Sequence, residues 1–281
     1  MTSEAIFAEH RRFLVGLAYR MLGSVAEAED VVQDAWLRFG EVDPATLDSP
    51  RAWLTRVTTR LCLDVLKSAR VSRQDYVGPW LPEPMRTDVK VDGDSLSMAL
   101  LVVLESLSPA ERAAFLLCEV FDYTHAEAAP LLEVSVDACR QLLHRARTRL
   151  RERRPRFEAT PETHARLLGA FVQAMIAGDL DGLKSVLHDD AVCYSDSNGK
   201  VQAARRPVRG AAAVSRLWLG LMRKGGASTP NFQAEIVELN ARPALVVRES
   251  GVVTSALLLE IEADRIIAVD FIRNPDKLAR L

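Results

Sequence analysis

The stretch "LSPAERAAFLLCEVFDYTHAEAAPLLEVSVDACRQLLHRARTRLRERR", residues 107–154, decides how the middle of this chain folds. Ser108-Pro109 is a typical helix start, and Thr124 caps a second, shorter helix. The triplet "EVS" before Val136 predicts a tight turn into a long helix rich in arginine. Two helices joined by a turn of three or four residues are typical of a helix-turn-helix, whose second helix can enter the major groove of DNA.

The predicted long helix has one polar face. Four residues on it could contact base edges, because arginine and glutamine form paired hydrogen bonds to guanine and adenine: Arg140, Gln141, His144 and Arg145. Arg147, Arg149 and Arg151 are better placed to neutralise phosphates. A solvated basic helix is the alternative, but the preceding turn and short helix favour DNA binding.

The whole chain has an ordinary globular composition. It has 281 residues, of which 48% are hydrophobic and 26% charged, enough for two or three small domains. The net charge of −2 hides a local asymmetry, since the segment 140–156 contains eight arginines. A nucleic acid would therefore bind to a local basic patch and not to the overall charge of the chain.

The sequence gives no sign of a membrane span, a metal site or a cofactor. No apolar run approaches the roughly 18 to 20 residues of a transmembrane helix, so a cytoplasmic protein is expected. The four cysteines lie far apart without a CxxC spacing, which favours buried reduced thiols over zinc or disulfides.

Residues 1 to about 72 are expected to form a compact helical domain. Apolar residues recur with helical spacing from Leu14 to Phe39, interrupted at Gly23-Ser24, and a third helix starts at Ser49-Pro50. The second helix carries a polar face with Asp30, Gln33, Asp34 and Arg38, which could simply be solvated. The third carries a basic face interleaved with Trp53, which suits a DNA strand that is being opened: Arg51, Arg56, Arg60, Lys67 and Arg70.

The segment "YVGPWLPEP", residues 76–84, is unusually apolar for a linker. Flexible linkers are normally rich in Gly and Ser or charged. Here three prolines restrict the chain, and Tyr76 and Trp80 offer large side chains for docking. A stiff spacer with incidental apolar residues is the alternative.

The C-terminal part of the chain has a different residue pattern. A helix-like stretch at 166–191 precedes four strand-like runs, "AEIVEL", "ALVV", "VVTSALLLEIE" and "RIIAVDFI". Ala263-Asp264 between the last two predicts a hairpin turn. Helices followed by an antiparallel meander indicate a small α+β domain.

The motifs "AEAEDVVQDAWLRF" (26–39) and "SPRAWLTRVTTRLCLDVLK" (49–67), followed by the helix-turn-helix, closely resemble regions 2 and 4 of bacterial extracytoplasmic-function (ECF) sigma factors. The resemblance implies three contacts. The first motif would bind the β′ clamp helices of core RNA polymerase through Asp30, Gln33, Asp34, Trp36 and Arg38. The second would open and read the minus-10 element through Trp53, Arg56, Arg60 and Lys67. The helix-turn-helix, next to the β flap, would read the minus-35 element through Arg140, Gln141, His144, Arg145 and Arg147.

Three further motifs resemble the SigJ-like subgroup, in which a SnoaL-like domain of the NTF2-like fold is fused to the sigma domains: "WLPEP" (80–84), "SDSNGKVQAARRPVRG" (195–210) and "NPDKL" (274–278). In that subgroup the fused domain contacts the linker and adjusts polymerase binding. The implied regulatory residues are Trp80, Leu81, Pro82, Glu83, Asp196, Asn198, Lys200, Asn274, Pro275, Asp276, Lys277 and Leu278. We expect Trp80 and Leu81 to pack near the second or third motif.

The sequence thus predicts a multidomain protein with two all-α sigma domains followed by an α+β NTF2-like cone. The expected ranges are 1–72 for region 2, 73–94 for the linker, 95–156 for region 4 and 161–281 for the regulatory domain. The predicted function is a sigma factor for promoter-specific initiation, and the alternative is a helix-turn-helix regulator with a small-molecule-sensing domain. Catalysis is not expected, although an Asp/His pair could be drawn from His164, His188, Asp189, Asp190 and Asp196. Binding of a small apolar ligand inside the cone remains an open alternative.

Overall fold

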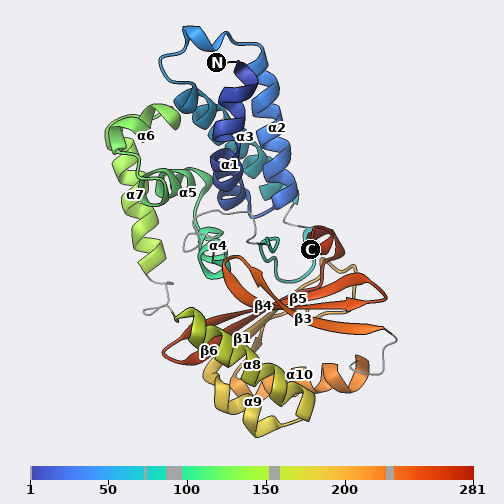
Figure 1. Ribbon diagram of the computed structural model, residues 1–281. Coiled ribbons are helices and arrows are strands. Elements are labelled where there is room, and N and C mark those ends of the chain that lie inside the picture. The colour runs from blue at the N-terminus through green and yellow to red at the C-terminus, as the bar shows by residue number, and fades with distance from the viewer. Residues whose placement is uncertain (1, 73–74, 87–96, 152–158, 226–230) are drawn as a thin grey trace. The chain divides into compact units, whose positions relative to one another are not determined.

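The computed structural model describes residues 2–72, 75–86, 97–151, 159–225 and 231–281, which form two compact units (Figure 1). The first unit comprises 1–75 and 100–154, and the second comprises 76–99 and 155–281. From Tyr76 on, the described part of the expected linker therefore belongs with the C-terminal domain. The expected domain boundaries near residues 72, 94 and 156 fall next to or within segments that the structure does not describe, so they remain predictions.

The first unit begins with three helices, α1 (Ser3–Leu22), α2 (Val25–Gly40) and α3 (Pro50–Ser72), with a short 3-10 turn η1 (Pro44–Thr46) before α3. Gly23 ends α1 with a φ of 69°, a conformation that glycine adopts without a steric penalty. The Ser24 hydroxyl then accepts the Glu27 N–H at 3.3 Å and starts α2, as the sequence predicted.

The second helical set contains α4 (Met98–Leu104), α5 (Pro109–Phe115), the π-helical turn η4 (Leu116–Val120), α6 (His125–Leu131) and α7 (Val136–Arg151). Capping boxes start α5 at Ser108 and α6 at Thr124. Glu133 adopts a φ of 56° and turns the chain from α6 into α7. The helix-turn-helix predicted from residues 107–154 is therefore confirmed.

Both helical sets share a buried contact within the first unit. The Arg112 side chain is buried, donates to the Met21 carbonyl at 2.5 Å and pairs with Glu105 at 2.7 Å. The rings of Phe13 and Phe121 meet edge to face, 4.9 Å apart. Packing of the two sets thus depends on a buried cation as well as on apolar surface.

The second unit is an α+β domain. Its helices are α8 (Pro161–Ala177), α9 (Leu180–Val186), α10 (Ala211–Gly225) and α11 (Pro275–Leu278); its strands are β1 (Leu187–Asp196), β2 (Val208–Arg209), β3 (Phe232–Leu239), β4 (Arg242–Glu249), β5 (Val252–Glu262) and β6 (Arg265–Ile272). The sheet order is β2-β1-β6-β5-β4-β3. Strands β3 to β6 form the expected antiparallel meander, and Ala263-Asp264 make the predicted turn with positive φ angles. The parallel pairing of β1 with β6 was not anticipated.

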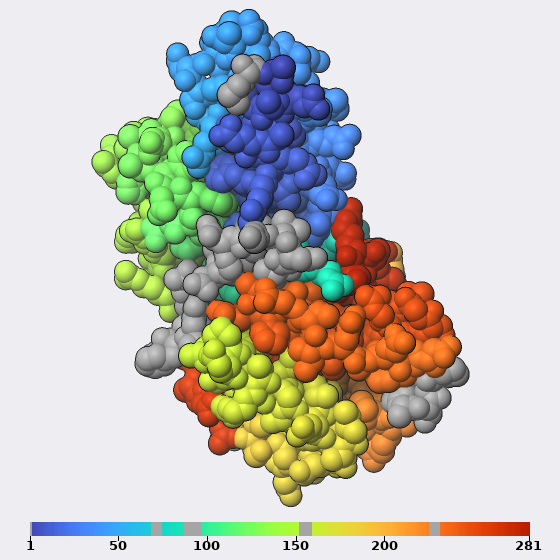
Figure 2. Space-filling view, in the orientation of Figure 1, coloured from blue at the N-terminus to red at the C-terminus, as the bar shows by residue number. Residues whose placement is uncertain are grey.

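The core of this unit lies between the sheet and the helices. Phe171 of α8, Trp218 of α10 and Phe271 of β6 are buried and stack edge to face. Figure 2 shows one face of the unit, with residues of β3 to β5 in orange next to α8 in yellow-green and α9 in yellow. Among the described residues, no helix has the length and apolar character needed to cross a membrane.

Candidate nucleic-acid interface and linker contacts

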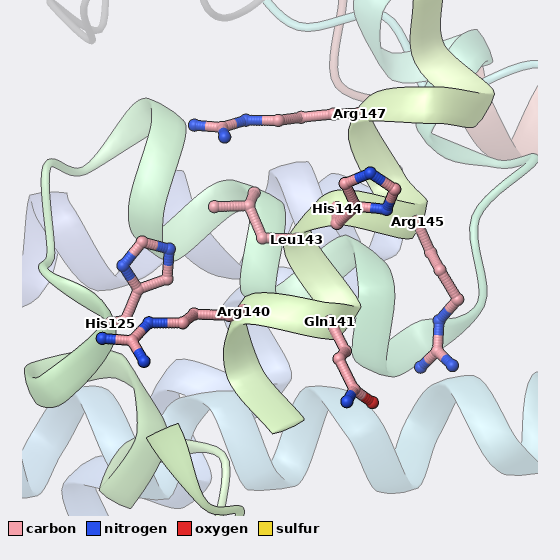
Figure 3. A pocket seen from close by; sticks show the side chains of 7 residues that line it. All are labelled: His125, Arg140, Gln141, Leu143, His144, Arg145 and Arg147. Carbon is pink, nitrogen blue, oxygen red and sulfur yellow. The ribbon is translucent and has the colours of Figure 1, made fainter. Parts of the chain in front are cut away.

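Helix α7 presents a basic surface, which we call the recognition surface. It is an open hollow of about 600 Å³ lined by His125, Arg140, Gln141, Leu143, His144, Arg145 and Arg147. Figure 3 shows Arg140, Gln141 and Arg145 extending away from α7, while His125 projects from α6. Five positions of α7 are buried, so the helix is fixed while its polar side chains stay exposed: Cys139, Leu142, Ala146, Leu150 and Leu143, which also lines the hollow.

Glu111 anchors the recognition helix. Its side chain is only 4% exposed and accepts the Ser108 N–H at 3.0 Å in the α5 capping box. It also pairs with Arg145 at 3.2 Å and with Arg149 at 2.5 Å. One buried carboxylate therefore joins the start of α5 to two arginines of α7.

The remaining cations of this surface have exposed partners. Arg140 pairs with Asp137 at 2.9 Å along the helix, and Arg147 pairs with Glu119. Exposed ion pairs contribute only about 0–1 kcal/mol to stability. Phosphates or base edges can therefore replace these carboxylates at little cost.

The polar face of α2 is exposed as the sequence indicated. Asp30, Gln33, Asp34 and Arg38 all lie at the surface, and Trp36 is half-buried against Phe7, with ring centroids 4.9 Å apart. Leu37 on the same helix is an apolar side chain that is 60% exposed, and no motif in the sequence had indicated it. This face combines charge with an apolar contact, as protein interfaces do.

Helix α3 also presents its basic residues outward. Arg56, Arg60 and Lys67 are exposed, whereas Trp53 packs on Phe39 at 5.7 Å. Arg60 pairs with Glu133 of the helix-turn-helix at 3.2 Å, and Lys67 pairs with Asp64 at 3.1 Å. The side chain of Arg70 lies outside the described residues.

A hollow of about 810 Å³ separates this part of α3 from the helix-turn-helix. Its lining includes Trp53 and Arg56 on one side and Tyr123, Glu127 and Pro130 on the other. Beside it, the hydroxyls of Thr55 and Tyr123 are 3.4 Å apart. The face expected to meet the minus-10 element therefore looks toward the same unit's helix-turn-helix.

Residues 76–86, which we call the strap, are held by a buried ion pair. Asp196 is fully buried at the end of β1, and its Oδ2 accepts the Leu81 N–H at 2.8 Å and Lys277 Nζ at 2.7 Å. Its Oδ1 accepts the Tyr76 hydroxyl. Lys277 also donates to the Leu81 carbonyl at 2.5 Å. Leu81 is 1% exposed, so strap backbone and charged pair are buried together.

Two aromatic rings of the strap surround the lysine. Lys277 Nζ lies 4.2 Å from the Trp80 ring centroid and 5.1 Å from that of Tyr76. Cation–π contacts of this kind offset part of the cost of burying an ammonium group. Burial and the Asp196 hydrogen bond raise the pKa of the Tyr76 hydroxyl well above its usual value, so it stays a donor.

The other predicted regulatory residues lie around this pair. The Asn274 amide donates to the Tyr76 hydroxyl at 3.0 Å and its Oδ1 caps α11, which begins at Pro275. Asp276 is exposed and pairs with Lys200. Asn198 accepts the Val77 N–H at 3.2 Å. Pro82 and Leu278 are buried. Glu83 is buried as well, and its carboxylate lies 3.7 Å from the Arg280 guanidinium.

The far end of the strap is bound by residues that no motif had indicated. Asn240 is buried between β3 and β4, where its N–H donates to the Met85 carbonyl at 2.8 Å and its Oδ1 accepts the Met85 N–H at 3.0 Å. Arg86 bridges to Leu239 and donates to the Leu281 carbonyl at 3.2 Å. The only signal in the sequence was the turn "NA", which marks a hairpin and not a binding site.

The acids and bases considered for catalysis are not brought together. His164 is buried on α8, where burial and then the charge of Arg242 lower its pKa to about 4. His188, Asp189 and Asp190 are exposed at the start of β1, and Asp196 holds the strap. None of these five residues belongs to the described lining of the cavity between sheet and helices.

A different pair of acids lies in the sheet, with Asp270 buried and Glu260 half-buried. Burial, followed by the charge of Glu260, raises the pKa of Asp270. Burial also raises the pKa of Glu260, to about 7. Side chains alternate along a strand, so Asp270 points to the face opposite Phe271 and the cavity.

Comparisons with known proteins agree with this geometry. The family model for Sigma-70 region 2 matches residues 6–71, and that for Sigma-70, region 4 matches residues 97–150. The chain is 38% identical to the ECF RNA polymerase sigma factor SigJ of Mycobacterium tuberculosis, over 96% of this chain and 91% of that protein. It is 33% identical to the probable ECF RNA polymerase sigma factor SigI of the same species, over 98% and 94%. The crystal structure of Mycobacterium tuberculosis SigJ superimposes with a TM-score of 0.80 at 34% identity, covering 98% of each chain.

Proposed function

The chain belongs to the extracytoplasmic-function RNA polymerase sigma factors, and from this premise we propose that its C-terminal α+β domain tunes initiation by holding the strap. Sigma factors bind core RNA polymerase and promoter DNA, and they are not enzymes. The regulatory part of the proposal goes beyond that membership, because it assigns a task to residues 76–86 and to the residues that bind them.

The observation that carries this proposal is the buried Asp196–Lys277 pair with the strap backbone bound across it. In the chain, the strap lies between the segments that match region 2 and region 4. Docking it removes part of the freedom of the connection between two DNA-binding modules. Since the effective concentration of a second linked module depends on linker length and stiffness, docking or releasing the strap alters promoter binding.

Within the sigma domains we assign the contacts as follows. The exposed face of α2 binds the β′ clamp helices through Asp30, Gln33, Asp34, Trp36 and Arg38. The basic face of α3 binds and opens the minus-10 element through Trp53, Arg56, Arg60 and Lys67. The recognition surface binds the minus-35 element, beside the β flap, through Arg140, Gln141, His144, Arg145 and Arg147. Exposure of the charged and polar side chains among them, and the weakness of the ion pairs of Arg60 and Arg140, support this assignment.

The role assigned to Arg60 requires that this side chain change its partner. Its guanidinium is paired with Glu133, so it must leave that carboxylate to reach DNA. The two groups are 63% and 60% exposed, and water or phosphate can replace the partner at little cost. In our proposal Arg60 therefore exchanges Glu133 for DNA when the promoter opens.

The C-terminal domain is, in our proposal, a binding and regulatory domain and not a catalyst. General acid–base catalysis needs a proton donor or acceptor within reach of the substrate. The cavity between the sheet and helices α8 and α10 is instead lined mainly by apolar side chains, which favours a small-ligand sensor as the second role of the domain.

The proposal is tested by run-off transcription with purified core polymerase and no other sigma factor. We compare the full chain with a chain that ends at residue 160 and with Trp80→Ala, which removes one ring over Lys277. Both changes should alter promoter output several-fold, while His188→Ala, at an exposed position, should leave it unchanged. Equal output from all four proteins would remove the domain from regulation.

A further inference from the structure

A cavity of about 530 Å³ lies in the C-terminal unit between the sheet and helices α8 and α10. Aromatic and aliphatic side chains form most of its wall, including Met175, Trp218, Leu221, Leu257 and Phe271. Small-molecule sites typically measure about 300–1,000 Å³ and combine such a wall with a few polar groups. The cavity therefore has the size and the surface of a ligand site.

One polar group in this wall has an unfilled hydrogen-bonding capacity. Arg273 donates through one terminal nitrogen to the Gln202 carbonyl at 2.5 Å, and its guanidinium lies 5.7 Å from the Phe271 ring centroid. Its Nε is buried and has no hydrogen-bond partner among the described residues. A guanidinium carries five N–H donors, and leaving a buried one unused is costly.

The charge at this position is also only partly balanced. Burial lowers the pKa of Arg273, and the charge of Glu249 counteracts that effect. The described cavity lining contains two cations, Arg273 and Lys224, and one anion, Glu249. A partly dehydrated cation in such a wall is stabilised by an anionic ligand, and a guanidinium matches the planar fork of a carboxylate.

We propose that the cavity binds an apolar, ring-containing monocarboxylic acid, whose carboxylate accepts from Arg273 and whose ring lies against Trp218 and Phe271. Neutral apolar molecules would fill the same space but would leave the guanidinium of Arg273 without an anion. Dicarboxylic acids would place a second charge against the apolar wall, which is costly. The arrangement thus selects for one anionic group on an apolar body.

The position of Arg273 connects this site to the strap. Its backbone N–H donates to the Asp196 carbonyl at 2.7 Å, and the next residue, Asn274, donates to Tyr76. A carboxylate that fixes Arg273 would also fix the end of β1, where Asp196 holds Leu81. This coupling rests on the proposed regulatory function, whereas binding itself does not.

Binding is tested by isothermal titration calorimetry of the full chain with 2-naphthoic acid and 2-naphthol, which differ in the anionic group. The acid should bind at least about tenfold more tightly, because a hydrogen bond to a charged group is stronger than one to a neutral group. Arg273→Gln should remove most of this preference. The matched control Arg265→Gln, at an exposed arginine at the start of β6 and outside the cavity, should retain it.

Equal affinity for acid and alcohol, or no binding of either below a Kd of about 1 mM, would overturn the proposal. The comparison of the two ligands uses the wild-type chain, so it decides the matter even if Arg273→Gln fails to fold, which circular dichroism would show. Coupling has its own readout: saturating 2-naphthoic acid should slow amide hydrogen exchange in residues 77–86. Binding without slower exchange would contradict the coupling alone and leave the transcription test above unaffected.

Discussion

Two lysine–aspartate pairs near the strap differ in burial. The side chains of Lys277 and Asp196 are 11% and 0% exposed, and both bind strap backbone. Those of Lys200 and Asp276 are 45% and 63% exposed. Removing one partner of a buried pair leaves an uncompensated charge without water, whereas an exposed pair contributes little. The same two residue types therefore form a fixed attachment in one place and an exchangeable contact in the other.

Most ion pairs of the recognition surface are exposed, like the Lys200–Asp276 pair. Arg140 and Arg147 are paired with partly or largely exposed carboxylates, and only Glu111 is buried. A surface that must give its cations to DNA benefits from weak partners. The strap, in contrast, is held by groups whose separation is costly. In our proposal this difference keeps the strap docked while the cations of the recognition surface remain exchangeable.

The largest expected effect is that of Lys277→Met. It leaves the Asp196 carboxylate buried without its cation and should cost roughly 3–5 kcal/mol of stability in the C-terminal unit. Urea unfolding followed by tryptophan fluorescence measures this loss. Lys200→Met is the matched control and should cost at most about 1 kcal/mol. Equal costs for both variants would contradict the distinction between the two pairs.

A smaller effect is expected for Asn240→Gly. Glycine tolerates the φ of 51° at this position, so the change mainly removes the acceptor of the buried Met85 N–H. The loss should be roughly 1–3 kcal/mol. Asn198→Gly removes the acceptor of the exposed Val77 N–H at a similar φ of 48° and should cost less. Hydrogen exchange of residues 77–86 reports on both variants, and the reverse order would show that the Asn240 contact does not hold the strap.

On the recognition surface, Arg145→Ala should reduce affinity by roughly 1–3 kcal/mol at one base pair of the minus-35 element. Arg147→Ala should weaken binding to all sequences alike, because we assign it to a phosphate. Binding of holoenzyme to a set of single-base promoter variants separates the two patterns. A uniform loss for Arg145→Ala would reassign it to a phosphate contact.

The smallest effect on stability is expected for Glu133→Gln, which breaks the exposed pair with Arg60. The stability of the first unit should change by at most about 1 kcal/mol. Promoter opening, measured by permanganate reactivity of unpaired thymines, should increase modestly because Arg60 is released. A large loss of stability would show that this pair is part of the contact between α3 and the helix-turn-helix.

The parts of the structure that could be predicted from sequence are local. Helix starts at Ser24, Ser108 and Thr124 depend on residues within three positions, and they are present as expected. The meander and its turn at Ala263-Asp264 are also set by neighbours in the chain. Strap residues such as Trp80 were indicated by a motif and by their unusual apolar character.

The rest could not be predicted because it joins distant residues. The parallel pairing of β1 with β6 and the Asn240–Met85 contact bring together segments far apart in the sequence. Arg60 was correctly expected at the surface, but its pairing with Glu133 depends on how two helical sets pack. Buried acids such as Asp270 are likewise evident only once the strands are in register.

The most direct test of the central claim is run-off transcription by core polymerase with the wild-type chain, Lys277→Met and Lys200→Met. We predict that Lys277→Met alters promoter output several-fold while Lys200→Met matches the wild type. Unchanged output from Lys277→Met, in a variant whose strap is shown by hydrogen exchange to be released, would contradict control of initiation through the strap.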